Sequence, residues 1–99
     1  MNRVFKALGD PTRRRILQML RERPMTAGEI AAGFNLAKPT LSGHFAVLRE
    51  ADLIAADKVG ATITYRLNLS VLQDALLGFA DSFGLDSSGA KTAPIEDTP

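Results

Sequence analysis

The segment that decides the fold spans residues 36–54 and has the sequence LAKPTLSGHFAVLREADLI. If it forms one helix, Leu41, Phe45 and Leu48 fall within a narrow arc, because each residue advances by about 100°. The other sides near its N-terminus carry small or short polar residues: Pro39, Thr40 and Gly43, with Ser42 and His44 flanking the arc. A helix that enters a DNA major groove, about 12 Å wide, needs such a slim polar front and apolar back. The alternative is an ordinary amphipathic core helix.

Length and composition limit the other possibilities. The chain has 99 residues and is 45% hydrophobic, enough for one small domain. It has no cysteine, which excludes disulfides, thiolate metal sites and cysteine nucleophiles. No apolar run approaches the roughly 20 residues of a membrane span. Charged and apolar residues alternate at the N-terminus, unlike a signal peptide, so we expect a cytoplasmic protein.

Charge is distributed unevenly along the chain. Residues 1–68 contain 11 Lys or Arg against 6 Asp or Glu, a net charge of +5. Residues 69–99 contain 1 against 5, a net charge of −4. A basic first part is typical of proteins with a polyanionic partner, although an imbalance of this size also arises by chance.

Three helices are predicted before the deciding segment. A short one covers residues 2–9, and Asp10-Pro11 then supplies an N-cap and a first-turn proline for a second, which reaches about Arg21. The capping-box pattern Thr26-Ala27-Gly28-Glu29 opens a third, after which Asn35 is predicted to be left-handed. Two short helices joined by a turn, the second polar at its N-terminal front, form a helix-turn-helix. The second is the recognition helix.

The pattern changes after Leu53. Residues 62–67 alternate between polar and apolar side chains, which predicts a strand that pairs with residues 54–58 around a turn at Val59-Gly60-Ala61. A second capping box at residues 70–73 predicts the last helix, and residues 85–99 show no periodicity. The predicted fold is therefore mainly α with a small β-hairpin wing, a winged helix-turn-helix in the order α-α-α-α-β-β-α. Residues 1–84 form the DNA-binding and dimerisation domain, and residues 85–99 a disordered tail.

Apolar side chains at both ends exceed what one small core needs. The helix-turn-helix already has enough apolar residues for its own core, so the surplus predicts an interface between two copies related by a two-fold axis. The alternative is that the last helix completes the core of a monomer. The expected interface residues are Val4, Phe5, Leu8, Leu72, Leu76, Phe79 and Phe83.

Two segments together carry a family resemblance. GDPTRRRIL at residues 9–17 and KPTLSGHFAVLREADLI at residues 38–54, followed by YRLN at residues 65–68, resemble the ArsR-type winged-helix repressors of bacteria. The lead NRVFKAL and the opening VLQD of the last helix are most similar to the SdpR-like autorepressor branch of that family.

This resemblance implies a homodimeric repressor that binds an inverted-repeat operator in double-stranded DNA and controls its own gene or a neighbouring one. It also implies dimer contacts from the first and last helices, and relief of repression by a membrane protein that sequesters the repressor. The implied DNA contacts on the recognition helix are Lys38, Pro39, Thr40, Ser42, Gly43 and His44, with the wing near Lys58 to Ala61. The cysteine pairs and histidines of the metal-sensing relatives are missing, so we expect no metal and no cofactor.

Several candidate site residues have alternatives. His44 either contacts DNA or packs against its own domain, and as the single histidine it cannot build a zinc site alone. The run Arg13-Arg14-Arg15 either binds phosphate or pairs within the domain. Arg49 and Lys38 are stronger phosphate candidates, and Lys58 and Arg66 could add wing contacts.

Two other classes of function were weighed. A winged helix can also serve as a protein-interaction module without DNA binding, which predicts an uncharged recognition helix and no dimer. An enzyme is not expected, because the sequence shows neither a paired set of catalytic carboxylates nor an activated nucleophile nor a phosphate loop.

Overall fold

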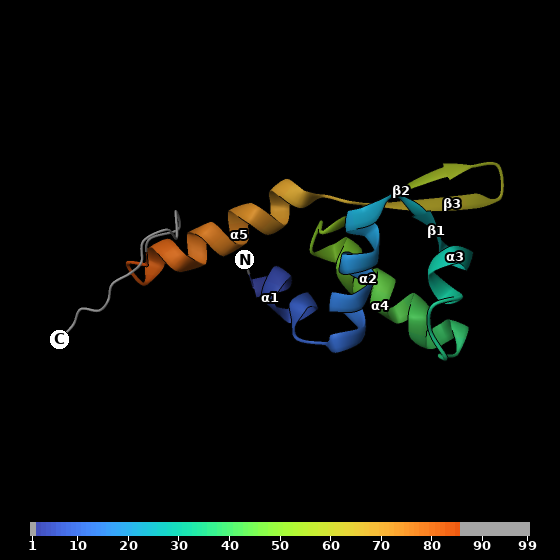
Figure 1. Cartoon of the computed structure of the whole chain (residues 1–99), viewed down its shortest axis with the longest axis horizontal. Helices are drawn as coiled ribbons and strands as arrows, with labels where there is room; N and C mark the ends of the chain where they lie inside the picture. The colour runs from blue at the N-terminus through green and yellow to red at the C-terminus, as the bar shows by residue number, and fades with distance from the viewer. Residues whose placement is uncertain (1, 86–99) are drawn as a thin grey trace.

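Residues 2–85 are described by the structure, a computed structural model. Figure 1 shows a helical body from which a β-hairpin and the last helix extend in opposite directions. In chain order the elements are α1 (Asn2–Leu8), α2 (Pro11–Glu22), β1 (Met25–Thr26), α3 (Ala27–Ala31), α4 (Lys38–Glu50), β2 (Ile54–Val59), β3 (Thr62–Leu67) and α5 (Leu69–Ser82). The predicted fold class, a winged helix-turn-helix, is confirmed.

The core is formed by one apolar face from each helix and the inner face of the sheet. Its largest fully buried side chains are Ile16, Ile30, Leu48 and Leu53. The three predicted apolar residues of α4, Leu41, Phe45 and Leu48, are all buried. In this way the core fixes which side of α4 faces outward.

Local sequence signals explain where α2 and α3 begin. The Asp10 carboxylate accepts hydrogen bonds from the backbone N–H groups of Thr12 and Arg13, and Pro11 occupies the first turn. At α3 the predicted capping box is present: Thr26 accepts from the Glu29 backbone, and the Glu29 side chain accepts from the Thr26 N–H. These caps satisfy backbone donors that a helix start leaves without partners.

The end of α4 differs from the prediction. The helix stops at Glu50, because Asp52 adopts a left-handed conformation with φ of 59°. The Leu53 N–H then bonds to the Leu48 carbonyl and the chain leaves as β2. Asn35, predicted to be left-handed, has no positive φ, and α3 ends earlier, at Ala31.

The wing is part of an antiparallel sheet with the order β1-β3-β2. In the hairpin Val59 pairs with Thr62, which leaves a two-residue loop whose first residue, Gly60, has φ of 61° as such turns require. The additional strand β1 was not predicted, because two residues show no periodicity. The Phe45 ring stacks on Tyr65 with centroids 4.6 Å apart, which joins α4 to the sheet.

The last helix begins one residue before the predicted capping box. Asn68 is its N-cap, but the Asn68 side chain makes no cap hydrogen bond and instead donates to the Asp52 carbonyl. The end of α5 lies away from the body (Figure 1). Residues 86–99, most of the predicted tail, lie outside the described residues, and the described Leu85 is exposed.

Candidate nucleic-acid interface and dimer surface

The N-terminal half of α4 presents the side chains predicted to contact DNA. Lys38, Pro39 and Thr40 in its first turn are exposed, as are Ser42 and Gly43. A Cβ atom added at Gly43 would meet no atom within 4 Å, so the surface at this point is open. The front of the helix is thus slim and accessible.

The backbone N–H groups of Lys38 and Thr40 lie in the first turn of α4, whereas Pro39 between them has no N–H. The N-cap residue is Ala37, and no side chain caps the helix. A helix start without a side-chain cap leaves N–H groups that point outward and favour an anion such as phosphate.

Two basic residues flank this front. Lys38, Ser42 and Arg49 are spaced so that they lie along one side of α4, and all three are exposed. The exposed Ala46 lies on the same outward part of the helix and was not predicted as a contact. Its position three residues after Gly43 places it near the same side of the helix, which could have indicated this exposure from the sequence.

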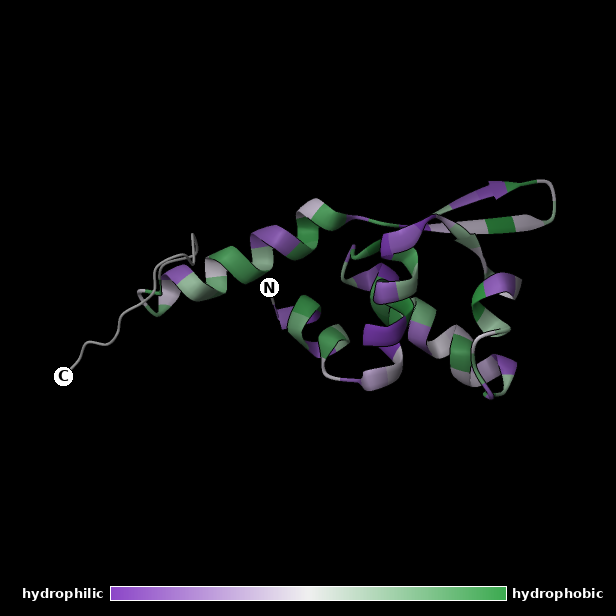
Figure 2. Cartoon of the chain, in the orientation of Figure 1, coloured by the Kyte–Doolittle hydropathy of each residue, from purple (hydrophilic) through white to green (hydrophobic). Residues whose placement is uncertain are grey.

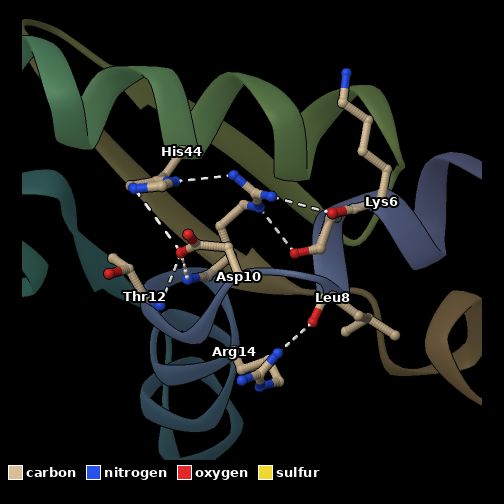
Figure 3. Close-up of polar contacts among 8 residues, drawn as sticks. Lys6, Leu8, Asp10, Thr12, Arg14 and His44 are labelled. Atoms are coloured by element: carbon tan, nitrogen blue, oxygen red, sulfur yellow. Dashed lines mark hydrogen bonds and ion pairs between the residues drawn. The ribbon is translucent and has the colours of Figure 1, made fainter.

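His44 has a different environment from the other predicted contacts. Only 16% of its side chain is exposed. Its Nδ1 lies 3.0 Å from the Arg13 guanidinium, and its Nε2 lies 3.9 Å from the Asp10 carboxylate (Figure 3). The structure therefore places His44 against its own domain, which is the alternative given above.

The basic run on α2 is used mainly inside the domain. Arg13 donates to the carbonyls of Ala7 and Lys6, and Arg14 donates to the carbonyl of Leu8 (Figure 3). These are the last carbonyls of α1, which have no partner within their own helix. Arg15 is exposed, and no hydrogen bond from its side chain occurs among the described residues.

The carboxylate of Asp10 is held in its charged form. Partial burial raises the pKa of Asp10, but the hydrogen bonds from the backbone N–H groups of Arg13 and Thr12 outweigh burial, so that the pKa lies below its usual value. A charged Asp10 next to His44 completes a polar cluster at the junction of α1 and α2.

The two basic residues of the wing differ in their contacts: among the described residues Arg66 is paired with a carboxylate, and no ion pair is found for Lys58. Lys58 is exposed near the tip of the hairpin. Arg66 is also exposed, but its Nε lies 3.2 Å from the Asp57 carboxylate and it also donates to the Asn68 side chain. Of the two predicted wing contacts, Arg66 has carboxylate and amide partners within the wing region, so Lys58 is the better candidate for a phosphate contact.

The residues predicted for the dimer surface fall into two groups. Val4 is only 6% exposed and belongs to the core of the protomer, so the expectation that it lies at an interface is corrected. The reason is that α1 packs against α4 and α2, while Val4 also lines a pocket together with Val71 and Ala75 of α5. Leu8 and Leu72 are partly buried against the core.

The remaining residues form the terminal apolar face, in which Leu76, Phe79 and Phe83 are exposed and Phe5 is partly buried. The Phe5 ring contacts Phe79 with centroids 5.0 Å apart, and Phe79 contacts Phe83 at the same distance. Phe83 is 68% exposed. Figure 2 shows hydrophobic residues along α5 beyond the body, and an apolar groove of about 330 Å³ lies between α2 and α5.

The described residues contain neither a metal-binding cluster nor a membrane-spanning helix. Between residues 2 and 85 no three His, Asp or Glu side chains are grouped so that they could hold a metal ion. Within the same range no helix has the length and hydrophobicity that crossing a membrane requires.

The α3–α4 pair, in which α4 is the recognition helix, and the β2–β3 hairpin define a winged helix-turn-helix DNA-binding protein. A family described as "Helix-turn-helix domain" matches residues 8–55. The transcriptional repressor SdpR of Bacillus subtilis is 50% identical over 76 residues, which cover 77% of this chain and 84% of SdpR. The HTH-type transcriptional regulator Rv2034 of Mycobacterium tuberculosis is 32% identical over 102 residues, 92% of this chain and 94% of that protein.

Solved structures agree with these relatives. An ArsR family transcriptional regulator superposes with a TM-score of 0.77 at 30% identity, covering 83% of this chain and 90% of that chain. HlyU from Vibrio cholerae gives a TM-score of 0.67 at 26% identity, covering 82% and 88%. The chain belongs to the ArsR family of winged helix-turn-helix transcriptional regulators.

Family membership decides between the functional classes considered above. The chain is a DNA-binding transcriptional regulator, which argues against a protein-interaction module without DNA binding. These relatives are regulators and not enzymes, in agreement with the expectation from the sequence.

Proposed function

We propose that this regulator is a metal-independent repressor that acts as a homodimer on an inverted-repeat operator and controls its own gene. The observation that carries the proposal is the N-terminal half of α4, which is slim, polar and exposed while its apolar back is buried in the core. This combination suits insertion into a major groove.

The exposed residues of α4 that were predicted to contact DNA have distinct parts in the proposed complex. The hydroxyl groups of Thr40 and Ser42 can donate to or accept from base edges. Pro39 and Gly43 add little bulk, so the helix axis can approach the bases closely. Lys38 and Arg49 contact phosphates, as does Lys58 on the wing, and these contacts set the register.

The homodimer is proposed from the terminal apolar face. Phe79 is 43% exposed and Phe83 is 68% exposed, and a two-fold axis allows the same apolar face to meet its copy. Such a dimer would present two α4 helices about 34 Å apart, one turn of DNA.

Independence from metal is proposed from the donor set. The chain has no cysteine and one histidine, and His44 is already engaged by Arg13. Structural and sensing zinc sites use about four nitrogen, sulfur or oxygen ligands.

A gel-shift titration tests the proposed DNA surface. The probe is the duplex enriched from a random DNA pool by the wild-type protein. Thr40→Ala combined with Ser42→Ala should lower specific affinity by about tenfold or more, since each good base contact contributes about 1–3 kcal/mol. Ser70→Ala, an exposed serine on α5, is the control and should bind normally. Unchanged affinity of the double variant would place the recognition surface elsewhere.

Autoregulation and sequestration by a membrane protein are two further predictions of this proposal. Autoregulation predicts that the DNA upstream of this chain's own gene contains the selected sequence. A sequestering membrane partner predicts that affinity purification from detergent-solubilised cells recovers a membrane protein together with this chain.

A further inference from the structure

A single guanidinium joins three helices of the domain. Arg13, at the start of α2, donates through Nε to the Ala7 carbonyl at 2.8 Å and through Nη2 to the Lys6 carbonyl at 3.0 Å, both at the end of α1. Its remaining nitrogen, Nη1, lies 3.0 Å from His44 Nδ1 on α4 (Figure 3). His44 is 31 residues away in sequence, so only the fold creates this contact.

The chemistry of this contact fixes the tautomer of His44. A guanidinium has only donors, so Nδ1 must accept and the ring proton must sit on Nε2. The Nε2 side faces the Asp10 carboxylate at 3.9 Å, which suits a ring nitrogen that carries a proton. Asp10 comes from the turn between α1 and α2, and Arg13 from α2.

We infer that His44 is a positioning residue for the recognition helix, which it ties through Arg13 to the junction of α1 and α2. This inference rests on the proposed insertion of α4 into DNA. Hydrogen bonds to charged groups are strong and directional, and this one lies on the flank of α4 next to its DNA-facing front. Because α1 also carries Phe5 of the terminal apolar face, the link connects the placement of α4 to the helix at the proposed dimer surface.

A double-mutant cycle on affinity for the selected duplex tests the inference. His44→Leu removes the acceptor and should weaken binding about tenfold, within the usual range for coupled contacts. Arg13→Gln should weaken binding at least as much, and adding His44→Leu to Arg13→Gln should then have no further effect. If His44 contacted DNA directly, His44→Leu would lower affinity by the same factor in both backgrounds, and the inference would be overturned.

Two variants separate positioning from charge and from loss of folding. His44→Asn places an acceptor oxygen where Nδ1 lies and should restore affinity to within about twofold of the wild type. Arg15→Gln removes the same charge from an exposed site on the same helix and should change affinity little. The salt dependence of binding should be unchanged by Arg13→Gln, because Arg13 neutralises no phosphate; a slope reduced by about 0.9 would contradict the inference.

A measurement without DNA tests the contact between Arg13 and His44 independently of the proposed function. The chain has one histidine, so its ring ¹⁵N signals are unambiguous at a pH where it is neutral. We expect the Nε2–H tautomer in the wild type and a mixture of tautomers in Arg13→Gln. A wild-type protein that enriches no duplex would refute the proposed function, whereas an Nδ1–H tautomer, or no response to Arg13→Gln, would overturn the inference itself.

Discussion

At the scale of single residues, basic side chains differ in the groups that they contact. Arg13 is committed to carbonyls and to His44, while Lys38 on α4 extends into solvent. The sequence indicated that Lys38 lies in the first turn of the recognition helix, beside its front, because that follows from helical periodicity alone. It could not decide the role of His44, because the partner that captures this ring comes from a distant helix.

Lys38 should act as a phosphate contact that reads no sequence. Replacing Lys38 with Gln should weaken binding to specific and unrelated duplexes alike. It should also reduce the slope of log K against log salt by about 0.9, because one counterion fewer is released. Fluorescence anisotropy at several salt concentrations measures both effects. Arg15→Gln is the charge-matched control, and an equal change of slope in that variant would show a general effect of net charge.

At the scale of elements, capping signals were the most informative parts of the sequence. The caps at Asp10 and Thr26 predicted the starts of α2 and α3 correctly, because the chemistry is local. The pattern at residues 70–73 was misleading, since α5 begins earlier, at Leu69, with Asn68 as its N-cap. The two-residue strand β1 was missed because it forms only through pairing with β3, a long-range contact without a local pattern.

The Asp10 cap of α2 should make the free energy of unfolding depend on pH in the acidic range. Burial raises the pKa of Asp10, but the backbone hydrogen bonds from Arg13 and Thr12 together with the nearby positive charge of Arg13 act in the other direction, so that the pKa is lowered in the folded chain. The folded state therefore binds fewer protons than the unfolded state, and the free energy of unfolding falls as pH drops through the lowered pKa. Asp10→Asn keeps an acceptor oxygen but does not titrate. Urea denaturation from about pH 7 to about pH 3 should show a smaller acid-induced loss in this variant, and identical profiles would refute the prediction.

The cap of α3 should contribute measurable stability to the helix-turn-helix. Thr26→Ala removes the acceptor for the Glu29 N–H, at 3.1 Å, and should lower the free energy of unfolding by about 1 kcal/mol. Urea denaturation measures the change. Thr62→Ala, an exposed threonine on the wing, is the matched control and should be close to neutral. Equal effects in the two variants would mean that the cap adds nothing.

At the scale of the whole molecule, the first and last described helices, α1 and α5, meet through Phe5 and Phe79. The sequence showed that α1 and α5 carry more apolar side chains than one core needs, which the exposed Phe79 and Phe83 illustrate. It could not separate Val4, which is buried in the core, from Phe5, which contacts Phe79. That distinction depends on how α1 packs against α2 and α4, which no local pattern encodes.

The terminal apolar face should hold two copies together. Phe83→Ala should raise the dimer dissociation constant by about a hundredfold, which corresponds to about 3 kcal/mol for a ring that becomes buried between protomers. Sedimentation equilibrium measures the constant. Val59→Ala removes an apolar side chain that is 77% exposed on the wing, away from this face, and should leave association unchanged. A wild-type monomer would rule out the proposed dimer.

The most direct test of the central claim is selection of duplexes from a random DNA pool by the wild-type protein, followed by sequencing. Two α4 helices held by a two-fold dimer should enrich an inverted repeat whose half-sites are centred about 10–10.5 base pairs apart or a multiple of that distance. Enrichment of a single half-site without symmetry, or of no sequence at all, would contradict the claim that paired recognition helices define the function of this protein.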